Sequence, residues 1–171
     1  MKLFDVNIGE TFKIADIEFI KFAQNGDRSI AVAKEAIFRS TFGNNGNFAE
    51  SKIKTRLESE FLPKLEAEIG AENIFEFETD MLALDGTKPY PNFNSRISLV
   101  TLGFYRQHRE MFAQHNPDCY WWLATPDSEA FKNIVLCVSP LGDFYYYVCI
   151  NYFGVRPVLC FESSIFVSCE G

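Results

Sequence analysis

The side chains best suited to catalysis in this chain are two histidines and five cysteines. His108 and His115 are seven positions apart, a spacing that does not place both on one helical turn. His115 lies four residues before Cys119, so a Cys–His nucleophile pair is one interpretation. Against it, Cys119 opens an apolar stretch, and burial raises the pKa of a thiol and makes it inert. A structural role for both residues is the favoured interpretation.

The recognised catalytic motifs give no further candidate. The sequence contains no HExxH, EF-hand loop, Walker-type phosphate loop, GxGxxG or GxSxG. Its 23 acidic residues leave a two-carboxylate hydrolase open, but no pair among them stands out. We therefore predict no catalytic residue, no cofactor and no metal ligand, and we keep an enzyme as the alternative.

Trp121, Trp122 and Arg156 are predicted to be structural. Sugars pack on aromatic faces, but neighbouring residues of a strand point to opposite sides, so at most one tryptophan can face a ligand. We expect at least one of them in the core. Arg156 stands between Val155 and Pro157 in an apolar stretch, which is typical of an arginine that binds a buried carboxylate or backbone carbonyl groups.

The aromatic run from Phe144 to Tyr147 is the better candidate for recognition. Alternation along a strand places Tyr145 and Tyr147 on one face, and Phe144 and Tyr146 on the other. Tyrosine is favoured in binding surfaces because it offers a large area at a small cost in side-chain entropy. Core packing and a binding surface both stay open for this run. The candidate binding residues are Tyr145, Tyr147 and Tyr152.

The overall composition excludes several classes of protein. The net charge of −7 lacks the basic footprint that binding to a phosphate backbone requires, so we predict no nucleic-acid partner. The chain is 47% hydrophobic and 16% aromatic, which supplies a core without disulfides or metal. Disorder is excluded on the same grounds.

The cysteines and the N-terminus predict a cytoplasmic location. The cysteines are odd in number, lie in the last third and form no CxxC pair, so we expect buried free thiols on strands in a reducing compartment. The first five residues include an acid where a signal peptide needs an apolar core. No apolar run approaches about 18–20 residues, so we predict no membrane span.

A β-hairpin is expected near the N-terminus. Residues 14–22 alternate as a strand, residues 24–28 supply a turn, and residues 29–36 form the returning strand. Further along, residues 74–84 are predicted as an irregular strand and residues 87–94 as a loop.

Helical periodicity occurs in two segments. Residues 49–69 carry apolar side chains at a spacing of four, and we expect Pro63 to split this run into two short helices and Gly70 to end it. Residues 98–112 form the other helix, with Ser98 as its N-cap.

The last third of the chain is predicted to contain strands only. Together these elements predict one α+β domain over residues 1–171, with an N-terminal hairpin, two or three helices and a C-terminal antiparallel β unit. The predicted strands of that unit are residues 120–124, 133–138, 144–150 and 155–161.

The order of the motifs resembles a bacterial and phage domain family of unknown function that is common in gut Firmicutes. Residues 51–61 match its helical segment S-x-L/I-R-x-W/R-L-N-x-E-F, and residues 121–126 (WWLATP) match its WWLRSPG strand. Residues 141–143 match its D-G turn, and residues 154–159 (GVRPVL) match its closing GVRPAL. Ala124 replaces the usual arginine, and the tyrosine-rich run replaces an Asn/Ser-rich stretch.

The C-terminal pattern of this family is in turn similar to the C-type-lectin-like and formylglycine-generating-enzyme-like fold. That similarity implies a scaffold that displays variable loops for binding. It does not imply sugar binding, because the calcium motifs EPN or QPD and WND are missing, and the paired cysteines of the oxidase relatives are missing too.

Three functional hypotheses follow. The first is a non-enzymatic binding or display module that recognises a protein or glycan through residues 145–153, encoded by a phage or prophage. The second is a hydrolase or transferase of unrecognised type. The third is a structural subunit of a phage or prophage assembly, in which case the protein would be associated with the virion.

Overall fold

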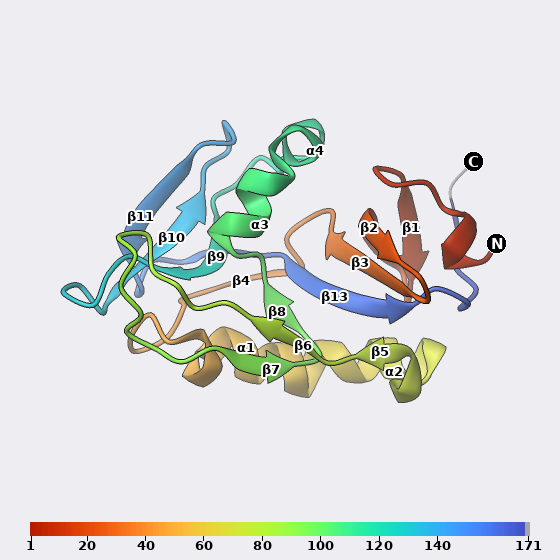
Figure 1. The fold of residues 1–171 in the computed structure, drawn as a ribbon, viewed down its shortest axis with the longest axis horizontal. Coiled ribbons are helices and arrows are strands. Elements are labelled where there is room, and N and C mark those ends of the chain that lie inside the picture. The colour runs from red at the N-terminus through yellow and green to blue at the C-terminus, as the bar shows by residue number, and fades with distance from the viewer. Residues whose placement is uncertain (170–171) are drawn as a thin grey trace.

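Two β-sheets make up most of the fold, and each takes strands from both halves of the chain (Figure 1). The structure is a computed structural model and describes residues 1–169. It has the predicted α+β class, with several sheets and few helices. The C-type-lectin-like topology stays a prediction.

The first sheet has the order β1-β2-β3-β13-β5, and β8 also pairs with β13. Its strands are β1 (Thr11–Ile14), β2 (Ile17–Asn25), β3 (Arg28–Ala33), β13 (Pro157–Glu162), β5 (Ile74–Phe75) and β8 (Ser98–Leu99). The second sheet has the order β11-β10-β9-β12-β4. Its strands are β11 (Phe144–Val148), β10 (Ile134–Val138), β9 (Trp121–Pro126), β12 (Phe153–Val155) and β4 (Phe38–Ser40). A separate pair contains β6 (Phe77–Thr79) and β7 (Phe93–Ser95).

The chain passes between the two sheets at two neighbouring crossings. Residues 34–37 lead from β3 to β4, and Arg156 alone separates β12 from β13. The N–H of Ile37 donates to the carbonyl of Val155 at 2.9 Å, so the two crossings lie side by side. Each sheet therefore needs a strand from the opposite half of the sequence.

The predicted hairpin is present as β2 and β3, joined by a turn in which Gly26 has a φ of 61°. The predicted strand over residues 14–22 is interrupted, because Ala15 and Asp16 have φ values of 50° and 62° and make a tight turn between β1 and β2. An alanine rarely adopts a positive φ, so the sequence gives little sign of this turn. The returning strand ends at Ala33.

The first helical segment is continuous from Lys52 to Ile69, and the predicted break at Pro63 is wrong. It consists of α1 (Lys52–Arg56), a π-helical turn (Leu57–Phe61) and α2 (Leu62–Ile69). Within it, the N–H of Leu62 reaches back to the carbonyl of Leu57. This shift puts Pro63 in the first turn of α2, where a missing amide is tolerated. Gly70 ends the helix as predicted, with a φ of 87°.

The second helical segment starts later than predicted and is divided. Ser98 belongs to β8, and its buried hydroxyl bonds to Thr79 Oγ1 at 2.8 Å instead of capping a helix. The cap is Thr101, whose hydroxyl accepts from Phe104 N. The helix is α3 (Leu102–Gln107), followed after a break at His108 by α4 (Arg109–Gln114).

The predicted strand over residues 74–84 contains only β5 and β6 and ends at Thr79. The predicted loop over residues 87–94 gives way to β7 at Phe93, which pairs with β6. Three short segments are 3-10 helices: Leu3–Asp5, Phe48–Glu50 and Ala71–Asn73.

The C-terminal strands divide between the two sheets. β9, β10 and β11 pair in antiparallel order, as expected for the C-terminal β unit. β12 runs parallel to β9 and is bordered by β4 from the N-terminal half, whereas β13 leaves to become an inner strand of the first sheet. The predicted strand over residues 155–161 is therefore two strands in two sheets.

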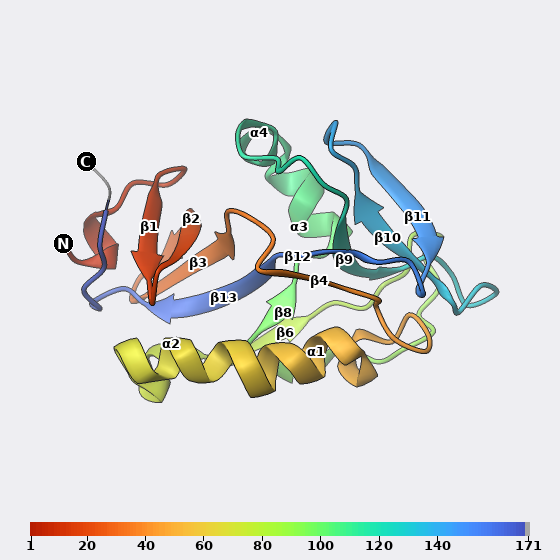
Figure 2. The same ribbon diagram turned by 180° about the vertical axis from the view of Figure 1, so that it is seen from behind.

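Two clusters of buried apolar side chains stabilise this arrangement. The larger lies between the sheets and the α1–α2 helix, which runs along one side of the molecule in both ribbon views (Figures 1 and 2). The smaller joins α3 and α4 to β2, β9 and β10. Within residues 1–169, no helix combines the length and the apolar composition needed to span a membrane.

Candidate functional site

The tryptophan pair forms the base of the candidate site. Both side chains are fully buried, and they belong to different cores because β9 turns one to each side. The indole N–H of Trp122 donates to the carbonyl of Ser40 at 3.0 Å, which ties β9 to β4. The indole N–H of Trp121 donates to Asn116 Oδ1 at 3.1 Å. Neither tryptophan is available to a ligand.

Arg156 is also fully buried, at the crossing between the sheets. Its Nε donates to the carbonyl of Ala33 at 3.0 Å and its Nη2 to the carbonyl of His115 at 3.4 Å. The guanidinium carbon lies 4.5 Å from the centre of the Trp121 ring. Of the two predicted kinds of partner, Arg156 therefore binds carbonyl groups, and it is not among the residues that form ion pairs with carboxylates within residues 1–169.

Burial governs the electrostatics of this arginine. It lowers the pKa of Arg156 from 12.5 to about 10, with a smaller opposing effect of Glu35. The Nη1 atom is buried without a hydrogen-bond partner among the described residues. Arg156 thus holds the two crossings together at a considerable desolvation cost.

An aromatic cluster covers the Trp122 side of the second sheet. Its members, which we call the tyrosine face, are Tyr120, Tyr145, Tyr147 and Phe153. Tyr120 is central, with ring centres 5.1 Å from Phe153, 5.8 Å from Tyr147 and 6.5 Å from Tyr145. Phe153 connects the cluster to the core through Trp122, whose ring centre is 4.7 Å away. The pair predicted to share a face, Tyr145 and Tyr147, does so.

Strand pairing explains why these rings meet. Trp122 lies opposite Cys137 of β10, and Cys137 lies opposite Tyr145 of β11, so the three form one row across the sheet. Val135 and Tyr147 form the next row. Alternation within β11 is enough to place Tyr145 and Tyr147 on one face. That Tyr120 and Phe153 join them depends on the register of strands that are far apart in the chain.

Tyr152, the third predicted binding residue, lies outside the tyrosine face. Its side chain is 64% exposed and follows the turn after β11. It makes no ring contact within the described part of the chain. The structure therefore groups Tyr145 and Tyr147 and leaves Tyr152 as a separate exposed ring.

The most distinctive feature of the site is β11 itself, which is the edge strand of the second sheet. All five of its side chains, from Phe144 to Val148, are exposed by 37–61%, and none carries a charge. Phe144 and Tyr146 occupy the side opposite the tyrosine face. Uncovered apolar edges are rare, because natural sheets protect edges with charges, prolines or bulges.

The backbone of β11 offers hydrogen-bonding groups along this edge. Cys149 N donates to Asn133 O, and Ser139 N donates to Asp143 O, so the odd-numbered residues exchange hydrogen bonds with β10. Antiparallel alternation then directs the N–H and C=O groups of Phe144 and Tyr146 away from the sheet. The outward carbonyl of Val148 already accepts from Asn151, which marks the end of the open edge.

The tyrosine face contains no acidic or basic residue. Interaction with the Tyr147 hydroxyl raises the pKa of Tyr120 above its usual value of 10. The phenol therefore stays protonated over the physiological range. The site can offer ring surface, hydroxyl groups and backbone hydrogen bonds to a ligand.

The Cys–His interpretation finds little support in the geometry. The hollow beside Cys119 is lined by Glu35, Arg39 and Asp118 among others, and His115 is not part of its lining. Desolvation raises the pKa of the Cys119 thiol, which opposes formation of a nucleophilic thiolate. No group of three metal-ligating side chains occurs within residues 1–169.

In comparisons with protein-family models, with curated proteins and with solved structures, no match to this chain was found.

Proposed function

We propose that this chain is a non-enzymatic protein-binding module that captures an extended segment of a partner along β11. The observation that carries the proposal is the uncharged edge strand, exposed on both faces and open along its outer side. A segment that pairs with β11 would continue the second sheet by one strand. This mode of recognition takes affinity from backbone hydrogen bonds and specificity from alternate side chains.

The two faces of β11 would read the two sides of such a segment. On one side lies the tyrosine face, where Tyr145 and Tyr147 add ring surface beside the edge. On the other side are Phe144 and Tyr146. Side chains at alternate positions of the segment would therefore meet aromatic rings on both sides, so we infer a preference for apolar or aromatic residues in the partner.

The size of the surface favours a short segment over a large globular partner. Aromatic side chains have about 150–250 Å² of surface, so the partly exposed side chains of β11 together offer on the order of 400–500 Å². A stable interface between globular proteins needs about 800 Å² from each partner. A single added strand matches the smaller area.

The buried residues beneath would keep this surface rigid. Trp122 supports Phe153 from below, and Arg156 fixes the crossing that places β12 beside β9. The proposal agrees with the motif resemblance, in which the tryptophan pair and GVRP segment form a frame and the stretch between them varies. We propose membership of that bacterial and phage family on the motifs alone.

The decisive experiment compares two changes at Tyr146. Peptides selected from a displayed random library against the wild-type chain supply the ligand, and calorimetry measures their dissociation constants. Tyr146→Pro removes an outward N–H that β10 does not use, a change that edge strands tolerate. Tyr146→Ala removes the same side chain and keeps the amide. We expect the proline variant to bind about tenfold more weakly than the alanine variant.

The control outcomes separate the competing explanations. Thermal unfolding of both variants should match, since the outward amide has no partner in the free protein. Equal binding by the two variants would show that the edge backbone is not used, as expected for a glycan held on the tyrosine face alone. Failure to select any peptide with a folded wild-type chain would also contradict the proposal.

A further inference from the structure

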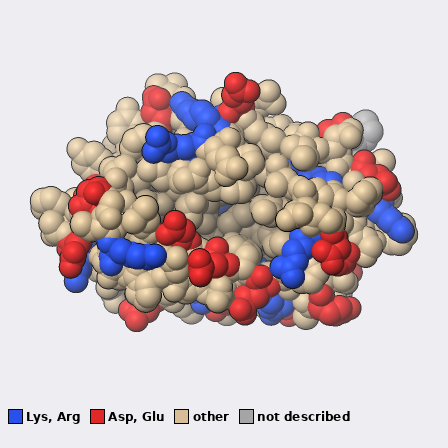
Figure 3. Space-filling model, in the orientation of Figure 1, with Lys and Arg blue, Asp and Glu red and all other residues tan. Residues whose placement is uncertain are grey.

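An apolar pocket opens on another part of the molecule, between α3, β6 and the inner strands of the first sheet. It encloses about 250 Å³, and Figure 3 shows the hollow near the centre of this face. The lining comes from β3, β6, β8, β13 and the start of α3. Its principal apolar residues are Ile30, Phe77, Leu99, Val100, Phe104 and Val158.

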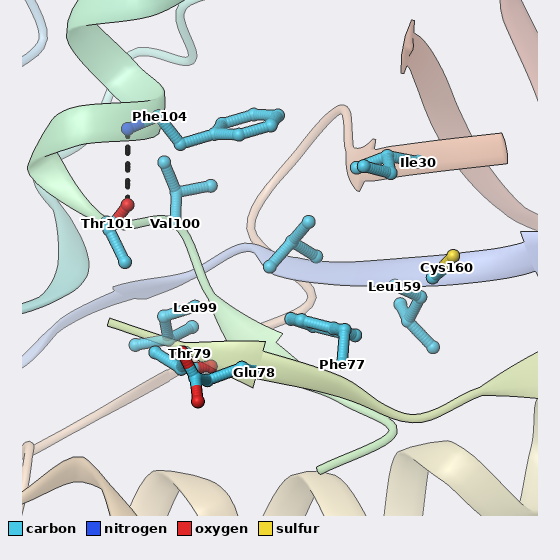
Figure 4. A pocket seen from close by; sticks show the side chains of 11 residues that line it. Ile30, Phe77, Glu78, Thr79, Leu99, Val100, Thr101, Phe104, Leu159 and Cys160 are labelled. Atoms are coloured by element: carbon cyan, nitrogen blue, oxygen red, sulfur yellow. Dashed lines mark hydrogen bonds between the residues drawn. The ribbon is translucent and has the colours of Figure 1, made fainter. Parts of the chain in front are cut away.

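Two phenyl rings form opposite walls of this pocket. Figure 4 shows Phe104 entering from α3 and Phe77 from β6, with Ile30 and the β13 side chains beyond them. Both rings are only partly buried, so each keeps surface that the protein does not cover. Aromatic rings attract one another in offset or edge-to-face contact at centre distances of about 4.5–7 Å. The walls therefore suit a ring better than a flexible alkyl chain.

The polar groups of the lining are already satisfied by the protein. The hydroxyl of Thr101 accepts from Phe104 N at 3.1 Å, and the hydroxyl of Thr79 bonds to Ser98 Oγ at 2.8 Å. A ligand in the pocket thus meets no buried polar group that requires a partner. The chemistry of the walls selects an apolar body.

The rim adds a preference of charge. Glu78 is the one charged side chain in the lining as described, and it is exposed beside Thr79. Its carboxylate accepts a hydrogen bond of 3.4 Å from Asn92 Nδ2. A ligand whose polar end emerges here is attracted if that end is cationic and repelled if it is anionic.

We propose that this pocket is a binding site for a small molecule made of one aromatic ring on a short chain that ends in an amine. A cavity of about 150 Å³ holds benzene, so this pocket holds one ring with a short substituent. The ring lies between Phe77 and Phe104, and the ammonium group emerges at the exposed rim, in the field of the Glu78 carboxylate. This inference is independent of the proposed function of β11.

Three matched probes test the chemistry. They are 2-phenylethylamine, the uncharged 2-phenylethanol and the anion phenylacetate, each titrated into the full chain at low salt while amide chemical shifts are followed. We expect dissociation constants in the millimolar range, as for ligands of this size. The amine should bind about two- to fivefold more tightly than the alcohol, as for an exposed ion pair, and phenylacetate should bind most weakly.

Variants assign the effect to named groups. Glu78→Gln should bring the amine to the affinity of the alcohol and leave the alcohol unchanged. Ile30→Trp fills the pocket and should abolish binding of both the amine and the alcohol. If that variant does not fold, Phe77→Ala, on a partly exposed wall of the pocket, replaces it and should weaken binding of both. Tyr147→Ala on the tyrosine face should bind all three probes like the wild type.

Four results would overturn the proposal. They are chemical-shift changes confined to β11, the absence of changes at about 10 mM amine, unaltered affinity in a folded Ile30→Trp variant, and an order of affinity that does not depend on Glu78.

Discussion

Arg156 shows how a single buried charge can be both costly and necessary. Burial lowers its pKa to about 10, and no carboxylate within residues 1–169 pairs with it. Its compensation comes from the carbonyls of Ala33 and His115 and from the Trp121 ring. These three partners belong to different segments, so the guanidinium acts as a connector.

Two substitutions at Arg156 separate its volume from its charge. Arg156→Ala leaves a cavity and two carbonyls without this donor, and we expect a loss of about 3–5 kcal/mol in the free energy of unfolding. Arg156→Met keeps most of the volume and removes the buried charge, so its cost should be about 1–2 kcal/mol. Denaturant unfolding measures both, with the exposed Arg106→Met as a control near zero. Equal losses for Met and Ala would contradict this explanation.

For single residues, the sequence predicts which side of a strand a side chain occupies better than it predicts which side chains of other strands it contacts. Alternation correctly put Tyr145 and Tyr147 together, since it depends only on the strand itself. Tyr120 and Phe153 join them through the register of β9, β10 and β12, which no local pattern encodes. Proximity in sequence predicts Tyr152 in the same group, but its position after the turn that follows β11 separates it.

Among the elements, β12 depends on the absence of one side chain. A Cβ on Gly154 would lie 2.8 Å from Ala36 Cβ, 3.2 Å from Cys119 Sγ and 3.2 Å from the carbonyl of Tyr120. Real Cβ atoms essentially never come within 3.0 Å of another atom, so the contact with Ala36 Cβ cannot be accommodated without a shift. Gly154 thus allows β12 to pass between β9 and the chain leading into β4.

Gly154→Ala should therefore destabilise the fold by about 1–3 kcal/mol through overpacking. Because its closest contact is Ala36 Cβ, the double variant Gly154→Ala/Ala36→Gly should recover part of this loss. A double-mutant cycle from denaturant unfolding measures the coupling, expected at about 0.5–2 kcal/mol. Strictly additive effects would show that the strain lies elsewhere. Gly103→Ala on α3, where an added Cβ would make only an ordinary contact of 3.9 Å with Thr101 Oγ1, is the control and should be neutral or stabilising.

The elements that the sequence misplaced share a physical cause. Pro63 was expected to break a helix, but a π turn moves the hydrogen-bond pattern so that its missing amide falls in the first turn of α2. Ser98 was expected to cap a helix, but pairing of β8 with β13 draws it into a sheet. In each case the local preference is overridden by a feature that the local pattern does not report: a shifted hydrogen-bond pattern within the helix for Pro63, and strand pairing for Ser98.

Because each sheet takes strands from both halves of the chain, the two sheets should unfold together. The crossings at residues 34–37 and at Arg156 link them, and the α1–α2 helix packs in the larger core that includes both. This arrangement leads us to expect one cooperative unit, in line with the prediction of a single domain over residues 1–171.

Buried thiols in each sheet can test this cooperativity. Cys137 lies in β10 of the second sheet and Cys160 in β13 of the first; both are buried, and burial raises the pKa of Cys137 to about 12. We expect both to react with a thiol label only on global unfolding, with the same free energy of opening across a denaturant series. Exposed Cys169 should react at once and serves as the reference. Earlier labelling of either buried thiol would indicate independent sheets.

The position of β13 between β3 and β5 has a consequence for the order of events on the ribosome. β13 begins 124 residues after β3 ends (33 to 157). At a synthesis rate of about 5–20 residues per second, the nascent chain carries β3 without its inner neighbour for about 6–25 s. During that interval the β2–β3 hairpin presents an unpaired apolar border to other nascent chains. Completion of the fold must therefore wait for the late-emerging strand, and we expect chaperones that shield exposed strands to raise the yield of folded protein.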